Sequence, residues 1–115
     1  MTYISGFVTP VKPENKDAYI ESARMAWPLF QEFGALSMNE GWGDNTPDGK
    51  VTDFRRAVQA EAGEIVVFSW VVWPDKATAD AAEGKMMSDP RMEQLPMPFD
   101  GKRMIYGGFQ TIFEG

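Results

Sequence analysis

The densest group of chemically capable side chains in this sequence lies between positions 42 and 56. It contains Trp42, Asp44, Asp53, Arg55 and Arg56. An arginine presents several donors in one plane, which suits a carboxylate or an enolate, and a neighbouring aspartate can orient it. The pattern predicts an anion-recognising pocket in which Trp42, Asp44, Arg55 and Arg56 bind the ligand and Asp53 is catalytic. The alternative is structural: Asp53 caps a short helix, and one arginine forms a salt bridge between subunits.

A second candidate is Tyr106, which precedes the pair Gly107-Gly108. Paired glycines in a strand mark a bulge, or a close approach of a ligand or another backbone. The Tyr106 phenol would donate a hydrogen bond into the interior or act as an acid–base group, so Tyr106 is the second predicted catalytic residue. The alternative is that the glycines permit close packing and that Tyr106 is a core aromatic.

The chain contains no cysteine and no histidine. Thiol nucleophiles, disulfides and cysteine-ligated metals are therefore excluded, and the usual haem ligand is missing. The stretch DNTPDG at 44–49 resembles the start of a calcium loop, but a loop that began at Asp44 would close on Arg55, a cation. We expect no metal and no cofactor. Proton transfer would fall to an acid such as Glu40 or to the two catalytic candidates named above.

The net charge and the targeting signals of the sequence narrow the possible partners and the expected location of the protein. The formal net charge is −6 and the isoelectric point is about 4.5. Such a surface repels phosphate backbones, so we expect no nucleic-acid partner. The start of the chain lacks the basic region of a signal peptide. The longest apolar run, 65–73, is far shorter than the roughly 20 residues that span a bilayer. We therefore expect a cytoplasmic protein with no membrane contact.

Hydrophobic periodicity and turn residues divide the chain into strands and helices. Strands are expected at 2–11, 35–42, 64–73 and 103–113. Helices are expected at 14–33, 53–60 and 76–88, with a connector rich in Pro and Met over 90–102. Pro28 should bend the first helix and Asp75 should cap the third. Apart from the short helix at 53–60, the order is β-α-β-β-α-β. This order predicts one α+β domain over residues 1–115, ferredoxin-like, with a four-stranded antiparallel sheet and two helices on one face.

The strand at 64–73 is apolar on both of its faces. Two helices cover only one face of a four-stranded sheet, so the other face would meet water in a monomer. Burial of one large apolar side chain is worth roughly 1.5–3 kcal/mol, and several exposed ones would be a severe penalty. We therefore predict a homodimer whose two sheets close face to face into an α/β barrel.

Three sequence blocks resemble a known family: VTDFRRAVQA at 51–60, VVFSWVVWPDKATAD at 66–80 and MPFDGKRMIYGGF at 97–109. They are similar to the YbaA-like family of uncharacterised bacterial proteins, DUF1428, within the dimeric α/β-barrel superfamily. The resemblance implies the fold and the dimer. It brings no established activity, although relatives in that superfamily include antibiotic-biosynthesis monooxygenases, muconolactone isomerases and haem-degrading enzymes.

Two hypotheses for function follow. In the first, each subunit binds or transforms a small anionic or aromatic molecule without a bound cofactor, as a monooxygenase-like or isomerase-like enzyme would. In the second, the protein is a non-enzymatic ligand-sensing or protein-interaction module. A deep pocket with convergent polar groups favours the first, and a barrel filled by side chains favours the second.

Overall fold

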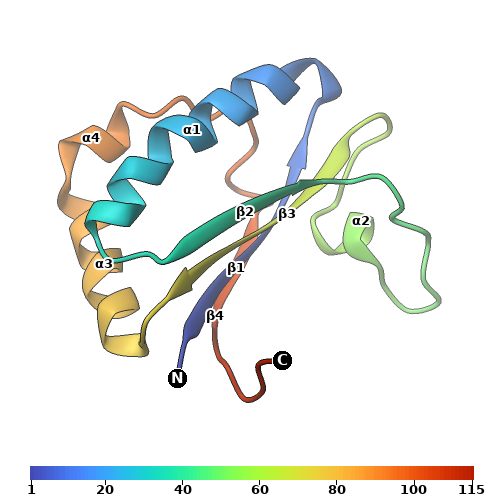
Figure 1. The fold of residues 1–115 in the computed structure, drawn as a ribbon. Helices are drawn as coiled ribbons and strands as arrows, with labels where there is room; N and C mark the ends of the chain where they lie inside the picture. The colour runs from blue at the N-terminus through green and yellow to red at the C-terminus, as the bar shows by residue number, and fades with distance from the viewer.

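The computed structural model describes all 115 residues as two layers, with a twisted sheet on one side and helices on the other (Figure 1). The four strands are β1 (Tyr3–Val11), β2 (Ser37–Trp42), β3 (Ile65–Trp73) and β4 (Ile105–Gln110). The helices are η1 (Pro13–Asn15), α1 (Lys16–Glu32), α2 (Phe54–Ala57), α3 (Lys76–Ser88) and α4 (Pro90–Glu93). The strand order is β2-β3-β1-β4, and every neighbouring pair is antiparallel. The predicted ferredoxin-like fold, with α1 and α3 on one face of the sheet, is confirmed.

The helices begin and end where local chemistry dictates. Pro13 opens η1 at a position where a backbone N–H would have no partner. α1 runs through Pro28 and ends before Gly34, whose φ of 111° is a backbone conformation that glycine adopts without strain. The Asp75 side chain accepts a hydrogen bond of 2.7 Å from the Thr78 backbone N–H, so Asp75 caps α3 as predicted.

Alternation along the strands sends successive side chains to opposite faces of the sheet. On the covered face, Val71 and Trp73 of β3 pack with Leu29 of α1, with Phe33 directly after α1 and with Ala82 of α3. Trp73 is almost fully buried. This cluster is the core, and it fixes the two long helices over the sheet.

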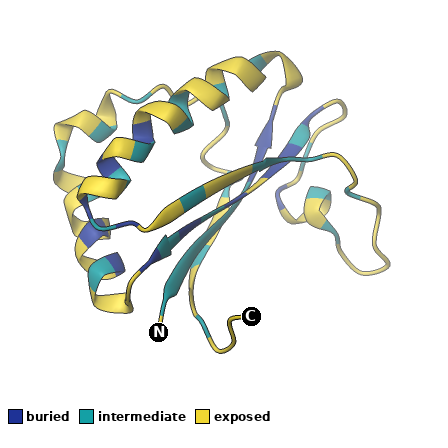
Figure 2. Cartoon of the chain, in the orientation of Figure 1, coloured by how far each residue is buried: buried dark blue, intermediate teal, exposed yellow.

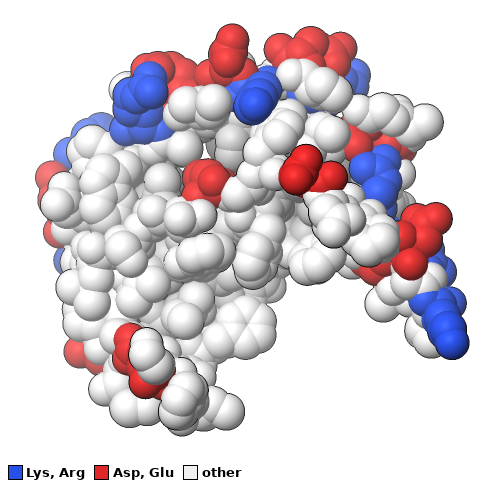
Figure 3. Space-filling view, turned by 45° about the vertical axis from the view of Figure 1, so that its right-hand side comes forward, with Lys and Arg blue, Asp and Glu red and all other residues white.

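The opposite face of the sheet, which we call the open face, has no helix over it (Figures 1 and 2). Phe68, Ile105 and Phe109 lie there with 46%, 44% and 59% of their surface exposed. Phe68 packs against Trp70 and Phe54 with tilted rings, whose centroids lie 5.5 and 6.0 Å away. Seen from this side, charged groups gather along the upper rim and on the projecting segment, with a broad, largely uncharged surface between them (Figure 3).

The last strand is shorter than predicted. The expected strand began at residue 103, but β4 begins at Ile105. Arg103 is held by Asp100 at 2.9 Å and by Glu64 at 2.7 and 2.9 Å, which keeps the backbone before β4 in a turn. The expected helix at 53–60 is only the single turn α2, and the connector carries the short helix α4, which was not predicted.

Candidate functional site

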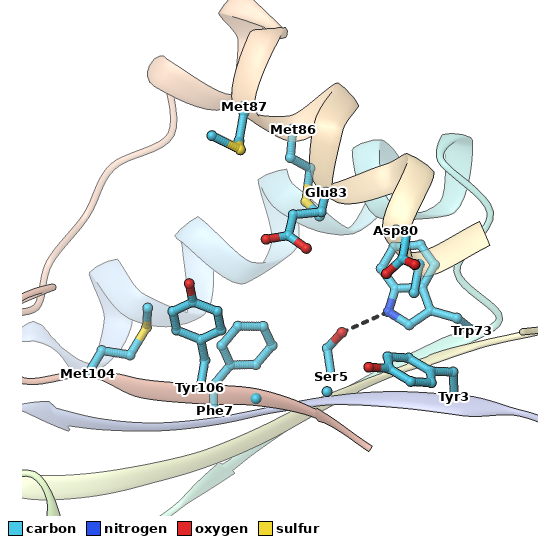
Figure 4. Close-up of a pocket in the computed structure, with 13 residues that line it drawn as sticks. Tyr3, Ser5, Phe7, Trp73, Asp80, Glu83, Met86, Met87, Met104 and Tyr106 are labelled. Carbon is cyan, nitrogen blue, oxygen red and sulfur yellow. Dashed lines mark hydrogen bonds between the residues drawn. The ribbon is translucent and has the colours of Figure 1, made fainter. Parts of the chain in front are cut away.

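A largely apolar cleft lies between α3 and the β1–β4 side of the sheet, and we call it the α3 cleft (Figure 4). Its volume is about 420 Å³. Aromatic rings form the floor, methionines close one end, and two carboxylates lie above. The lining residues are Tyr3, Ser5, Phe7, Trp73, Ala79, Asp80, Glu83, Met86, Met87, Met104, Tyr106, Gly107 and Gly108.

The strand register assembles this floor. Phe7 of β1 lies opposite Tyr106 of β4, and their rings stack with centroids 6.3 Å apart and planes 25° apart. The Tyr3 ring lies over Gly108, where a Cβ atom would overlap the tyrosine hydroxyl. Trp73 Nε1 donates a hydrogen bond of 3.0 Å to Ser5 Oγ, which fixes the indole at the end of the cleft. The predicted close approach at the glycine pair is therefore a contact with Tyr3 of the same chain.

The charges at the α3 cleft are negative. Asp80 pairs with Lys76 at 2.6 Å, whereas Glu83 has no ion pair and reaches from α3 toward Phe7 and Tyr106 (Figure 4). No lysine or arginine lines the cleft. The geometry therefore suits a neutral or cationic aromatic molecule. It does not suit the anionic ligand that was one of the sequence-based alternatives.

A second, smaller cavity of about 210 Å³ lies under α1, and we call it the α1 cavity. It shares Phe7 and Met104 with the α3 cleft. At one end the Tyr19 hydroxyl donates a hydrogen bond of 2.8 Å to Glu40 Oε1. The sequence pattern did not single out Tyr19, and it indicated Glu40 only as one possible proton carrier. The alternation of β2, which turns Met38 and Glu40 to the covered face, was the signal for this pair.

Asp53, which was predicted to be catalytic, caps α2. Its carboxylate accepts hydrogen bonds from the backbone N–H of Arg56 at 2.7 Å and of Gly49 at 3.1 Å, and from Arg56 Nε at 2.8 Å. These bonds stabilise the ionised form and lower the pKa of Asp53 to about 2. The contacts of Asp53 therefore agree with the structural alternative, in which Asp53 caps a short helix. Its catalytic role stays a prediction.

The two predicted ligand-binding arginines are held by backbone carbonyls. Arg55 donates to the carbonyls of Glu64 at 2.6 Å and Glu61 at 3.0 Å. Arg56 donates to the carbonyls of Val51, at 3.1 Å, and Gly49. Both side chains tie together the segment that projects from the edge of the sheet (Figure 1).

The predicted site residues fall into three separate places. Asp53, Arg55 and Arg56 line one shallow polar hollow. Trp42 and Asp44 line another, together with Phe54 and Phe68, and the Lys16 ammonium lies 5.4 Å from the Trp42 ring centroid. Tyr106 lies at the α3 cleft. The structure therefore does not bring the six predicted residues into one pocket.

Two further observations bear on the possible kinds of site. No group of three acidic side chains lies close enough together to hold a metal ion. No helix combines the length and the hydrophobicity that a membrane crossing requires.

The fold and the clefts define a ferredoxin-like α+β protein with cavities between its helices and its sheet. The family model of DUF1428, described as a protein of unknown function, matches residues 2–101, so the chain belongs to the DUF1428 family. It is 60% identical over 116 residues to uncharacterized protein YbaA of Escherichia coli strain K12, with 99% of both chains covered. The YbaA protein of Shigella flexneri matches equally well, with 60% identity and 99% coverage of both chains.

Solved structures share the fold at low sequence identity. A dimeric ferredoxin-like protein from an uncultured marine organism has a TM-score of 0.63 at 12% identity, covering 99% of this chain and 98% of its own. A ferredoxin-like protein of unknown function from Jannaschia, also described as dimeric, has a TM-score of 0.57 at 14% identity, with 95% and 99% covered. SnoaB, a cofactor-independent oxygenase from Streptomyces nogalater, has a TM-score of 0.53 at 12% identity, with 98% and 95% covered. These likenesses confirm the fold.

Proposed function

We propose that the protein is a homodimer in which each subunit binds a small aromatic molecule in the α3 cleft without a bound cofactor. The observation that carries the proposal is the cleft itself. It is a cavity of about 420 Å³ with aromatic and thioether walls and no basic side chain. Clefts of this size that combine apolar walls with a few polar groups are the usual sites for small ligands.

The exposed area of the chain supports the dimer. The chain exposes 7552 Å². A compact monomer of this mass exposes about 6300 Å². The excess is larger than the roughly 800 Å² that each partner covers in a standard interface. The open face, which carries Phe68, Ile105 and Phe109, is the apolar surface available to make that contact.

Of the two predicted catalytic residues, Tyr106 is the one at the α3 cleft, and we propose it as the group that acts on a bound molecule. The fold is shared with a cofactor-independent oxygenase, which supports oxygenase-like or isomerase-like chemistry. In that case Tyr106→Phe, which retains the ring, would abolish turnover and leave ligand affinity unchanged.

The second candidate, a non-enzymatic sensing or interaction module, is favoured by the contacts of Tyr106. The Tyr106 hydroxyl has no hydrogen-bond partner within the chain that could accept its proton, so nothing in the cleft activates it as a base. In a sensing or interaction module the bound ligand would be released unchanged.

The predicted anion site at Asp53, Arg55 and Arg56 stays a prediction. We place the ligand elsewhere because the guanidinium donors there already bind Asp53 and backbone carbonyls. An anion would have to displace these bonds. Arg55→Ala and Arg56→Ala should therefore leave the binding of an aromatic ligand unchanged.

Two variants of β4, one on each face of the strand, test the proposal. Indole is titrated into the labelled protein by NMR, and the dimer is followed by sedimentation velocity. Tyr106→Ala removes an aromatic wall of the cleft and should weaken indole binding about fivefold, because one aromatic contact is worth about 1 kcal/mol. Phe109→Ala, on the opposite face of β4, should weaken the dimer and leave indole binding intact. Equal indole affinity in both variants, or the absence of binding in the unmodified protein, would overturn the ligand site.

A further inference from the structure

The α1 cavity is a second space, half open to solvent, with a construction of its own. The segment 94–104, which we call the strap, crosses α1 and closes the cavity where no helix covers the sheet. Ser22 Oγ on α1 donates a hydrogen bond of 2.6 Å to the Pro96 carbonyl, and the Tyr19 ring packs 5.8 Å from the Phe99 ring. The strap is thus fixed to the helix by polar and aromatic contacts, and it encloses about 210 Å³.

Oxygen atoms gather at one end of this otherwise apolar space. The Tyr19 hydroxyl is bonded to Glu40, and Ser69 lies opposite Glu40 in the β2–β3 register. Thr9 of β1 lines the same end, and Thr9 and Ser69 are almost fully buried. The remaining lining is mostly hydrocarbon, aromatic and thioether surface from α1, the strap and the sheet. A ligand that fits here has a small apolar body and a single head group that donates hydrogen bonds.

The charge of that head group follows from Glu40. Burial raises the pKa of the Glu40 carboxyl, and the hydrogen bonds from Tyr19 and Ser69 oppose that shift only in part. No lysine or arginine forms an ion pair with Glu40 or lines the cavity. Lys16, one turn before Tyr19 on α1, places its ammonium over the Trp42 ring instead. A carboxylate that faces an apolar cavity without a cationic partner is complementary to an incoming cation.

We propose that the α1 cavity binds the ammonium group of a small primary amine, with the nitrogen at Glu40 and the apolar body between α1, the sheet and the strap. The site goes beyond the α3 cleft because its polar residues are different. Glu40 lies on the edge strand and is exposed, so the amine reaches the carboxylate from the side of the sheet. The same exposure limits the contribution of the ion pair to about fivefold in affinity.

The test compares two molecules of nearly the same size and shape that differ in charge. 2-Phenylethylamine and 2-phenylethanol are titrated at neutral pH, and the NMR shifts of residues 19, 40 and 69 are followed. The amine should bind about fivefold more tightly than the alcohol. Glu40→Gln retains the shape of the side chain and should reduce that ratio to about one. Tyr19→Phe retains the charge of Glu40 and should leave the preference for the amine in place.

Glu14→Gln is the matched control, because Glu14 of η1 is an exposed carboxylate that lines neither the α3 cleft nor the α1 cavity. It should leave the preference for the amine unchanged. The inference is overturned if the unmodified protein does not discriminate, if the ratio persists in Glu40→Gln, or if neither compound shifts these residues at millimolar concentration. Failure here is distinct from failure of the α3 cleft, which is measured with indole and the Tyr106→Ala variant.

Discussion

The side chain of Phe68 offers the sharpest test of the proposed dimer. It lies on the open face with 46% of its surface exposed. Full burial of a phenylalanine is worth roughly 1.5–3 kcal/mol, so covering the exposed half contributes about 1 kcal/mol per subunit. Two symmetric copies contribute about 2 kcal/mol, which corresponds to about a 30-fold change in the dissociation constant. We therefore expect Phe68→Ala to weaken the dimer about 30-fold.

Sedimentation velocity over a dilution series measures this change. Ile20→Ala is the control, because Ile20 is exposed to a similar extent, 43%, but lies on α1, across the sheet from the open face. Phe68 also contacts Phe54 and Trp70, so circular dichroism must show that the variant is folded under the conditions of the assay. The reasoning is refuted if the unmodified protein is monomeric at micromolar concentration, or if both variants dimerise as tightly as it does.

Two further predictions concern stability. Arg103→Ala should lower the free energy of unfolding by about 2–3 kcal/mol, because it leaves the buried Glu64 carboxylate without its cation. The pKa of Glu64 is lowered to about 2 by Arg103, from an ordinary value of 4.5. The stabilisation is therefore present above pH 4.5, and the gap between variant and parent in urea unfolding should shrink as the pH falls from 4.5 toward 2. A difference in the free energy of unfolding that stays constant over this pH range would contradict the stabilisation of Glu64 by Arg103. Gly108→Ala should displace the Tyr3 ring and lower the melting temperature, whereas Gly101→Ala, where the added methyl meets open space, should not; equal melting temperatures would refute the contact.

The fold was predictable because hydrophobic periodicity carries most of its information. The strand predicted at 64–73, which is apolar on both faces, is β3, one of the two central strands of the sheet. The predicted third helix at 76–88 matches α3 residue for residue. The start of β4 was not predictable. It depends on an ion pair between Arg103 and Glu64, which are far apart in the sequence and are joined only by the finished fold.

The candidate site was harder to predict for a related reason. Arg55 and Arg56 are adjacent in sequence, yet each binds a different set of backbone carbonyls, so their shared charge does not form one recognition surface. Tyr19 and Glu40 are 21 residues apart, separated by most of α1 and the turn before β2, and only the packing of α1 over β2 joins them. Of the predicted residues only Tyr106 lies at the α3 cleft, because strand alternation turns it to the covered face.

The position of β1 in the sheet has a consequence for how the chain folds. The first strand, β1, lies in the middle of the sheet, where Val11 pairs with Ile65 and Val8 pairs with Ile105. One of its edges therefore stays unpaired until β3 has been synthesised, and the other until the last strand, β4, has been synthesised. Closing such long loops precedes any gain from pairing, so the barrier is entropic and folding is slow for a chain of this length, in milliseconds or longer. Loss of β1 would separate β4 from the paired strands β2 and β3, so the four strands would no longer form one sheet.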